Sequence, residues 1–341
     1  MDFWFPLSIT FIISLVAIKV INPIAVKTGL VDFPCDRKIH KGNIPLVGGI
    51  AIYLAVLITS MLFIEHSRNL NIYLVASALV LFLGTLDDRY QLSVKIRLVA
   101  QVLVASLVIF GTEIYLHSLG YILGWFELKL AGFGIVLTVI AIIAGINAIN
   151  MMDGMDGLVG LLSVVAFTAL AFLLSRVTNA WYLLPFLFIA ALLGYLIFNL
   201  HSSVTKIFMG DSGNMLIGLT LVWLMVIGIE LDAPALRPVT ALYIIAVPLM
   251  DMATVIMRRV KSGVSPFQAD RQHLHHIFEA AGYSHRFSLI VISSGASILA
   301  LLGCLAEVYA VAEWIMLVSF LLFFMCYSAI TKQVWKKLTK I

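Results

Sequence analysis

The chain has 341 residues, of which 62% are hydrophobic and only 12% are charged, and its formal net charge is +4. A soluble globular domain carries about 45–50% apolar and about 25% charged residues, so this composition excludes a soluble protein and indicates an integral membrane protein. The three cysteines stand apart without C-x-x-C spacing, which argues against a disulfide framework and against a zinc site.

Apolar runs long enough to cross a bilayer follow one another along the whole chain. A helix of about 20 apolar residues spans the roughly 30 Å hydrocarbon core. The runs cover about 3–21, 46–64, 70–86, 96–112, 132–148, 158–175, 180–199, 213–230, 238–257, 287–305 and 310–330. We therefore predict an all-α polytopic membrane protein with about 11 transmembrane helices, formed as a single domain over residues 1–341. The first run has no basic leader and no cleavage site, so we interpret it as a transmembrane helix and not as a signal peptide.

The basic residues fix the expected orientation. If the N-terminus faces outside, only four of the 22 Lys and Arg residues fall on the outer side, and the other eighteen fall inside. The four are Arg68, Lys129, Arg176 and Arg237. Such a positive-inside bias predicts an outer (periplasmic) N-terminus and a cytoplasmic C-terminus.

With this topology the aspartates collect on the inner face. The clusters are Asp32 with Asp36, Asp87 with Asp88, Asp153 with Asp156, and the single Asp211 and Asp270. Solvated charges without a function would be scattered over both sides. We therefore predict an active site on the cytoplasmic face, formed by the loops 22–45, 87–95, 147–157, 200–213 and 258–286.

The first inner loop carries four potential cations within five residues, Arg37, Lys38, His40 and Lys41. Two interpretations remain open. The loop is either a basic segment beside anionic lipid or a clamp for a phosphate group.

The second inner loop contains the adjacent carboxylates Asp87 and Asp88. Two neighbouring carboxylates repel each other and call for a cation or a shared proton. A helix C-terminus also disfavours negative charge, so a purely structural role fits poorly. Lys95, about two helical turns further on, is expected to return to the same face.

The third loop reads N-A-I-N-M-M-D-G-M-D-G over residues 147–157. Asp153 and Asp156 share one face if the segment is helical, and Asn150 adds a neutral oxygen ligand. The alternative is that Asp156 only caps the helix that follows, which would explain one aspartate but not the second together with an asparagine.

In the fourth loop Asp211 stands between Gly210 and Gly213. One carboxylate in such a setting suits a magnesium ion that keeps several waters and takes substrate phosphates as further ligands. The alternative is a second helix cap.

The last inner loop contains His273, His275 and His276. Their spacing does not aim all three at one metal ion on a regular helix, and they are better suited to donate to an anionic or polyhydroxyl substrate. Asp251, inside the ninth apolar run, is either a structural residue with hydrogen-bond partners or a support for the site. Hard oxygen ligands and phosphate donors on one face, without a Ser-His pair or a redox motif, predict magnesium-assisted phosphoryl transfer.

Four motifs in order, D-D-R-Y-Q, N-M-M-D-G-M-D-G, K-I-F-M-G-D-S-G and D-R-Q-H-L-H-H, resemble those of the polyprenyl-phosphate N-acetylhexosamine-1-phosphate transferases. The resemblance runs nearly end to end. It implies transfer of GlcNAc-1-phosphate from UDP-GlcNAc to undecaprenyl phosphate with release of UMP, as the first membrane step of O-antigen or common-antigen assembly. It further implies the bacterial inner membrane as location, Mg2+ or Mn2+ as cofactor, no nucleic-acid partner, and leaves a homodimer open.

The resemblance also implies roles for individual residues. The metal ligands are Asp211 and Asn150, the catalytic pair is Asp87 and Asp88, and the substrate-binding residues are Lys41, Lys95, Asp153, Asp156, Arg271, His273, His275 and His276. The family's first motif often carries a third acid where this chain has Gln91, which puts more of the role on the aspartate pair.

The sequence leaves two mechanisms of phosphoryl transfer and two alternative functions open. A lipid phosphate is largely ionised at neutral pH, so we favour its direct attack on the sugar-bearing phosphorus over a phospho-enzyme formed on Asp87 or Asp88. A transferase that uses UDP-MurNAc-pentapeptide or another UDP-sugar is the main alternative. A transporter or flippase is the remoter one, because its intramembrane acids would lie near the midplane.

Overall fold

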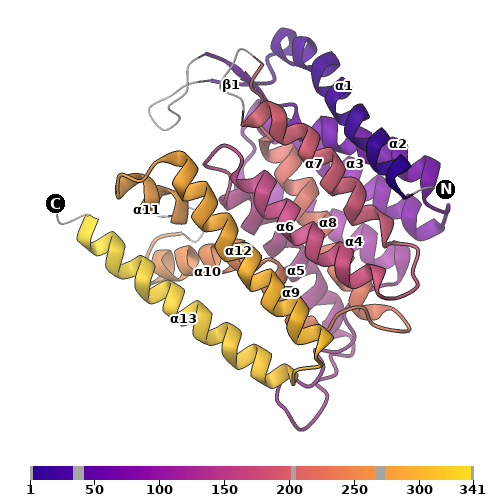
Figure 1. The fold of residues 1–341 in the computed structure, drawn as a ribbon, viewed down its shortest axis with the longest axis vertical. Coiled ribbons are helices and arrows are strands. Elements are labelled where there is room, and N and C mark those ends of the chain that lie inside the picture. The colour runs from indigo at the N-terminus through magenta and orange to yellow at the C-terminus, as the bar shows by residue number, and fades with distance from the viewer. Residues whose placement is uncertain (1–2, 34–41, 201–204, 266–272, 339–341) are drawn as a thin grey trace.

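The computed structural model describes residues 3–33, 42–200, 205–265 and 273–338 (Figure 1). Within them the chain forms helices and one pair of short strands. The helices are α1 (Trp4–Thr28), α2 (Gly48–Phe63), α3 (Arg68–Tyr90), α4 (Val94–Thr112), α5 (Phe133–Met151), α6 (Leu158–Ser175), α7 (Leu183–Asn199), α8 (Gly210–Glu230), α9 (Pro238–Ile244), α10 (Ala246–Lys261), α11 (Leu274–Ala280), α12 (His285–Val308) and α13 (Glu313–Leu338). Strands β1 (Val31–Asp32) and β2 (Ile44–Pro45) pair antiparallel.

Each of the eleven apolar runs is helical in the structure. Among the described residues, eight helices are long and apolar enough to cross a membrane, or nine if the bent pair α9 and α10 is one span. The apolar helices α2 and α7 are shorter, with 16 and 17 residues. The prediction of a helical polytopic membrane protein is thereby confirmed, while the count of eleven spans stays a prediction.

The ninth run differs from the expected continuous helix. It breaks at Ile245, and α9 and α10 meet at an angle of 86°. Pro248 in the first turn of α10 explains the break, because proline has no N–H to donate to the carbonyl of Ile244 and its ring crowds the preceding turn. Hydropathy averaged over a sliding window does not reveal such a break, since both halves are apolar.

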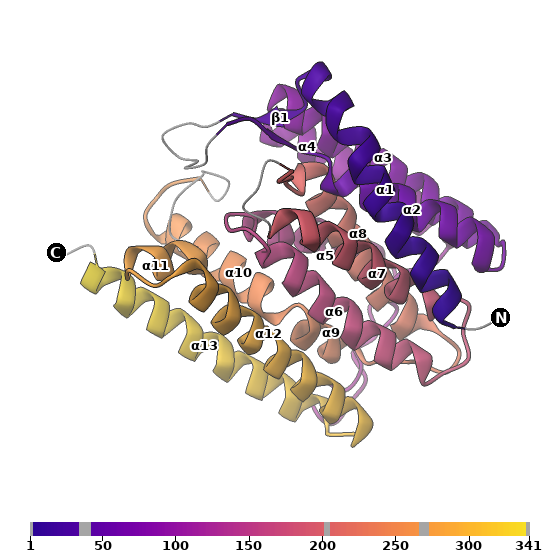
Figure 2. The ribbon, with the colours of Figure 1, turned by 45° about the horizontal axis from the view of Figure 1, so that its top comes forward.

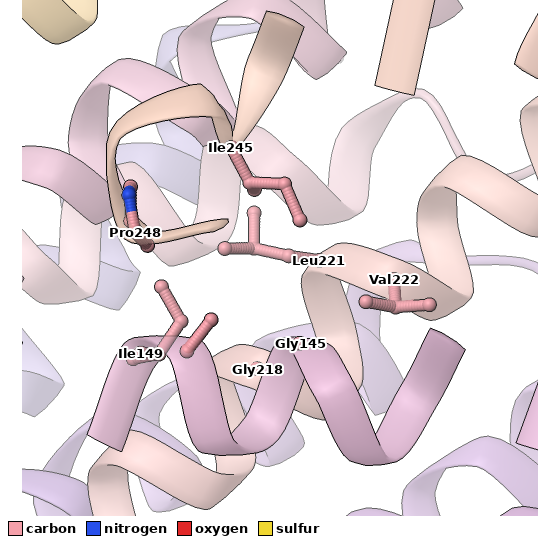
Figure 3. A pocket seen from close by; sticks show the side chains of 8 residues that line it. Gly145, Ile149, Gly218, Leu221, Val222, Ile245 and Pro248 are labelled. Carbon is pink, nitrogen blue, oxygen red and sulfur yellow. The ribbon is translucent and has the colours of Figure 1, made fainter. Parts of the chain in front are cut away.

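Helix α8 forms the centre of the bundle. It packs against α2, α3, α5 and α6, and 94% of its apolar window is buried. Figure 3 shows where α5 and α8 cross beneath the break between α9 and α10. A Cβ atom on Gly218 would lie 2.5 Å from the Cα atom of Ile146, so the two backbones approach as closely as only glycine allows.

The segments that carry the polar motifs lie at one end of this bundle. Figures 1 and 2 place β1, α11 and the C-terminal end of α13 on one side of the molecule, and the start of α1 on the opposite side. At the motif-bearing end, the backbone N–H groups of Gly48 and Gly49 donate to the carbonyls of Phe208 and Met209, both at 3.0 Å. The starts of α2 and α8 are thus joined directly.

Candidate active site

The N-terminus of α8 is held tightly between α2 and α3. A Cβ atom on Gly49 would lie 2.3 Å from the backbone nitrogen of Gly213, and one on Gly84 would lie 2.3 Å from the Cα atom of Ser212. Real Cβ atoms do not come so close to backbone. Glycine at these two positions therefore lets three helices meet, and it fixes where the first turn of α8 lies.

Asp88 caps this helix from the end of α3. Its Oδ1 accepts from the N–H of Asp211 at 2.7 Å, and its Oδ2 accepts from the N–H of Ser212 at 3.2 Å. The first N–H groups of a helix have no partner within the helix, and the N-terminus carries a partial positive charge. The negative charge expected to be ill placed at the end of α3 is therefore stabilised by the start of α8.

Asp87 has a different set of partners. Its carboxylate accepts from the N–H of Leu92 at 2.8 Å and forms an ion pair with Arg97 at 2.9 Å, and its side chain is 3% exposed. The sequence pointed to Lys95 as the nearby cation, but Lys95 is exposed on α4. Gln91, in place of the family's third acid, is the left-handed C-cap of α3 with φ of 49°.

Asp211 lies in the first turn of α8 and is not the cap of its own helix, since Asp88 has that role. Its carboxylate accepts no hydrogen bond from the residues described in the structure. Asp88, Asp87 and Asp153 are near enough to repel its charge, and Arg97 is near enough to attract it. A carboxylate surrounded by other carboxylates creates a local demand for positive charge.

The segment between α5 and α6 is not helical, so Asp153 and Asp156 do not share a helical face. Each carboxylate instead meets a residue of α8 or of the segment that leads into it. Asp153 Oδ2 accepts from Asn214 Nδ2 at 2.7 Å, and Asp156 Oδ2 pairs with Lys206 Nζ at 2.6 Å. Helix α6 begins after Gly157 without a side-chain cap, so Asp156 is not a capping residue.

Two more side chains complete this junction. The buried Asn199, at the end of α7, accepts from the N–H of Gly157 at 2.6 Å and donates to the carbonyl of Ile207 at 2.9 Å. Asn150, in the last turn of α5, accepts from Asn214 Nδ2 at 3.2 Å. The segments 150–157 and 205–214 therefore form one hydrogen-bonded unit.

Four of these residues were missed from the sequence. Lys206 begins a quoted motif, Arg97 and Asn214 follow shortly after quoted motifs, and Asn199 ends an apolar run, but none of the four carried a predicted role. Asn199 could have been noticed from the sequence, because it is a polar amide at the end of an apolar run. The partners of the other three depend on contacts between distant segments, which spacing along the chain does not reveal.

The histidines lie at the start of α11, and Asp251 holds that start in place. Asp251 accepts from the N–H of Leu274 at 3.0 Å and from the hydroxyl of Tyr327 at 2.7 Å, and its other oxygen lies 2.7 Å from His273 Nδ1. Asp251 is thus a buried residue with hydrogen-bond partners that supports the histidine segment. This answers the question that the sequence left open.

His275 and His276 differ in their surroundings. His275 is 1% exposed, neither ring nitrogen has a hydrogen-bond partner within the residues that the structure describes, and its ring lies against the backbone of Gly154. Burial, together with the neighbouring His276 and His273, lowers the pKa of His275 to about 3. It is therefore neutral at physiological pH, while His276 pairs with Glu279 at 3.0 Å. Lys41 and Arg271, both predicted to bind substrate, lie outside the described residues.

The oxygen ligands at the start of α8 fit a hard divalent cation. Asp211 offers a carboxylate, and Asn150 offers an amide oxygen that has a second lone pair left. The buried Asn214 Oδ1 has no hydrogen-bond partner among the described residues. No three His, Cys, Asp or Glu side chains form a metal-binding group among the residues described. A site of few protein ligands suits Mg2+, which keeps waters and takes substrate phosphates as ligands.

Comparison with known proteins shows which sequences this chain is similar to. Residues 70–229 match the family described as glycosyl transferase family 4. The chain is similar to proteins named undecaprenyl-phosphate alpha-N-acetylglucosaminyl 1-phosphate transferase. The relative from Salmonella typhi is 42% identical over 96% of this chain and 90% of its own length. The relative from Escherichia coli K12 is 41% identical over 92% and 86%, and that from Pasteurella multocida is 40% identical over 97% and 94%.

Proposed function

The chain belongs to glycosyl transferase family 4, and on this basis we propose that it transfers GlcNAc-1-phosphate from UDP-GlcNAc to undecaprenyl phosphate. The products are undecaprenyl-diphosphate-GlcNAc and UMP. The acceptor and the transferred group are those in the names of the three relatives, which cover nearly the whole chain. The motifs of the sequence support UDP-GlcNAc as donor and the initiation of O-antigen or common-antigen synthesis.

The observation that carries this proposal is the carboxylate of Asp211 at the N-terminus of α8. It accepts no hydrogen bond from described residues, and the acids Asp88 and Asp153 stand near it. A diphosphate substrate brings more negative charge to such a site, so a divalent cation is required there. We propose that Asp211 and Asn150 hold Mg2+, or Mn2+ in its place. When bound, the ion neutralises charge on the diphosphate.

In the proposed reaction an oxygen of the lipid phosphate forms a bond to the phosphorus that carries the sugar. The bond between this phosphorus and the bridging oxygen breaks, and UMP leaves with the electron pair. The lipid phosphate is already largely ionised at neutral pH, so no strong base is needed. The protein contributes by positioning the two phosphates in line and by compensating their charge.

The surroundings of Asp87 and Asp88 favour this direct attack over a phospho-enzyme. Both oxygens of each carboxylate accept hydrogen bonds or ion pairs, from Leu92 and Arg97 for Asp87, and from the first turn of α8 for Asp88. A nucleophilic carboxylate would have to give up such a bond. We propose that the pair acts by holding α4 and α8 in place for the reaction.

The remaining predicted residues are assigned to the substrates. Asp153, which is exposed, and Asp156, which is partly buried, are proposed to contact the nucleotide. The proposed substrate-binding set further comprises Lys41, Lys95, Arg271, His273, His275 and His276. Because His275 is neutral, its contact would be a hydrogen bond to a hydroxyl or amide and not an ion pair with phosphate.

We also propose eleven crossings of the bacterial inner membrane, with the N-terminus outside and the site on the cytoplasmic face. The bias of basic residues supports this orientation. It places the charged donor and the charged head of the lipid on the side where nucleotide sugars are made.

An assay with purified protein tests the function. Labelled UDP-GlcNAc, undecaprenyl phosphate and Mg2+ are combined, and the organic phase is analysed for lipid-linked sugar. We expect lipid-linked GlcNAc-1-phosphate that depends on all three components. Product from UDP-MurNAc-pentapeptide alone would refute GlcNAc as the transferred sugar, and no product from either donor would refute the function.

A further inference from the structure

Asn214 is buried in the first turns of α8. Its side chain is 0% exposed. It stands three residues after Asp211, so the two side chains lie on neighbouring positions of one helix face. Its Nδ2 donates to Asp153 Oδ2 at 2.7 Å and to Asn150 Oδ1 at 3.2 Å. One amide group therefore contacts the proposed nucleotide residue and the proposed metal ligand.

The other end of the same amide is unsatisfied. Asn214 Oδ1 is buried and has no hydrogen-bond partner in the described parts of the chain. Leaving a buried acceptor unpaired costs about 1–3 kcal/mol, and native structures rarely accept this cost without a reason. The orientation of the amide is fixed, because its two contacts are both oxygen acceptors and need the N–H groups. No described residue donates to Oδ1, so it is available to accept from a bound ligand.

From these contacts we propose that Asn214 is a positioning residue that couples the cation site at Asp211 to the nucleotide segment at Asp153, with Oδ1 accepting from the waters of the hydrated cation. The inference rests on the proposed function, because it assumes the cation. Mg2+ keeps several of its waters when it binds to proteins, and these waters are strong donors. Residues that contact metal ligands or their waters change metal affinity about 10- to 100-fold when they are removed.

The segment around Asp153 does not need Asn214 to keep its fold. Asn199 joins the backbones of Gly157 and Ile207, and Lys206 pairs with Asp156. These contacts remain when Asn214 is replaced. A variant at this position should therefore fold, and its effects should appear in binding.

The test compares Asn214→Leu with a matched control, Thr220→Val. Leucine keeps the approximate shape of asparagine but removes all its hydrogen bonds. Thr220 is likewise 0% exposed on α8, and its hydroxyl pairs with Tyr73 at 2.8 Å, away from the site. Binding of Mn2+ to the purified proteins is measured by electron paramagnetic resonance without substrates. The KM values for UDP-GlcNAc and undecaprenyl phosphate are measured separately.

We expect Asn214→Leu to weaken Mn2+ binding and to raise the KM for UDP-GlcNAc, each by about tenfold, with the KM for the lipid unchanged. Thr220→Val should leave all three values unchanged. A second variant, Asn214→Asp, keeps the shape but sets a carboxylate against Asp153. It should raise the KM for UDP-GlcNAc while Mn2+ binding is retained or strengthened, which a role in packing alone would not produce.

The outcomes separate the two proposals. If the wild-type protein binds Mn2+ and transfers GlcNAc-1-phosphate, but Asn214→Leu matches it in Mn2+ binding or in donor KM, the role of Asn214 is refuted and the function stands. If the wild-type protein transfers no GlcNAc-1-phosphate, the proposed function is refuted. If it transfers GlcNAc-1-phosphate but binds no Mn2+ without substrates, the function stands and the role of Asn214 at a cation site of the free protein is refuted.

Discussion

Replacing Gly84 by alanine tests how the site is built. Gly84 is where α3 meets the first turn of α8. The added Cβ atom would lie 2.3 Å from the Cα atom and 2.5 Å from the nitrogen of Ser212. Ordinary van der Waals contacts need about 3.4–4 Å. Backbone atoms cannot move aside by a change of rotamer, as a side chain can. We therefore expect α3 and α8 to separate by about 1 Å, at an overpacking cost of about 1–3 kcal/mol.

This displacement acts on the cap of α8. The hydrogen bond from the N–H of Asp211 to Asp88 is 2.7 Å long, and a shift of about 1 Å takes it out of hydrogen-bond range. Asp211 then loses its fixed position. A misplacement of about 1 Å at a reacting centre costs on the order of a hundredfold in rate, so we predict a fall of kcat of that size for Gly84→Ala.

The assay measures kcat at saturating donor and lipid, well below the melting temperature of the variant. The control is Gly295→Ala in α12, where an added Cβ atom would meet nothing within 4 Å. This change should leave kcat unchanged and stabilise the helix by up to about 1 kcal/mol. A Gly84→Ala protein with the kcat of the wild type would show that the position of α8 relative to Asp88 does not matter for activity.

Three more predictions concern the surroundings of the site. Arg97→Met leaves the buried carboxylate of Asp87 without its cation and should destabilise the protein by about 1.5–3 kcal/mol, measured as a fall in melting temperature; an unchanged value would show that the pair is dispensable. The pKa of His275 is lowered to about 3, so its contribution to stability is complete above about pH 6.5 and is lost as the pH falls below it. When the pH is lowered from about 7.5 to about 5.5, the melting temperature of the wild type should therefore fall by more than that of His275→Gln. Equal falls in the two proteins would contradict this. Tyr327→Phe removes one donor from Asp251 and should speed hydrogen exchange in residues 274–280, with a stability loss of about 1 kcal/mol.

Much of the fold follows from hydropathy alone. Helices require about 20 apolar residues to cross a bilayer, and this demand is local, so ten of the eleven predicted runs are single helices in the structure and the ninth is a bent pair of helices. The break at Ile245 was missed because Pro248 interrupts the helix without interrupting the apolar run. Its effect depends on the hydrogen-bond pattern of the backbone and not on hydropathy.

The site was predicted as a set of residues but not as a set of contacts. The motifs placed Asp88, Asp153 and Asp211 at one end of the bundle, and the structure brings them together there. The cap that Asp88 provides for α8 joins residues more than 120 positions apart, which no local pattern encodes. Asp153 likewise meets Asn214, 61 positions further along the chain, and the spacing of Asp153 and Asp156 does not reveal this contact.

The central claim is direct transfer of GlcNAc-1-phosphate between two substrates held at α8. The most direct measurement is a rapid-quench experiment with UDP-GlcNAc labelled at the sugar-bearing phosphorus, performed with and without undecaprenyl phosphate. We predict that the label passes into the lipid in a single step, that UMP appears only when lipid is present, and that Asp211→Ala abolishes both. Label bound to the protein, with release of UMP before lipid is added, would contradict this account.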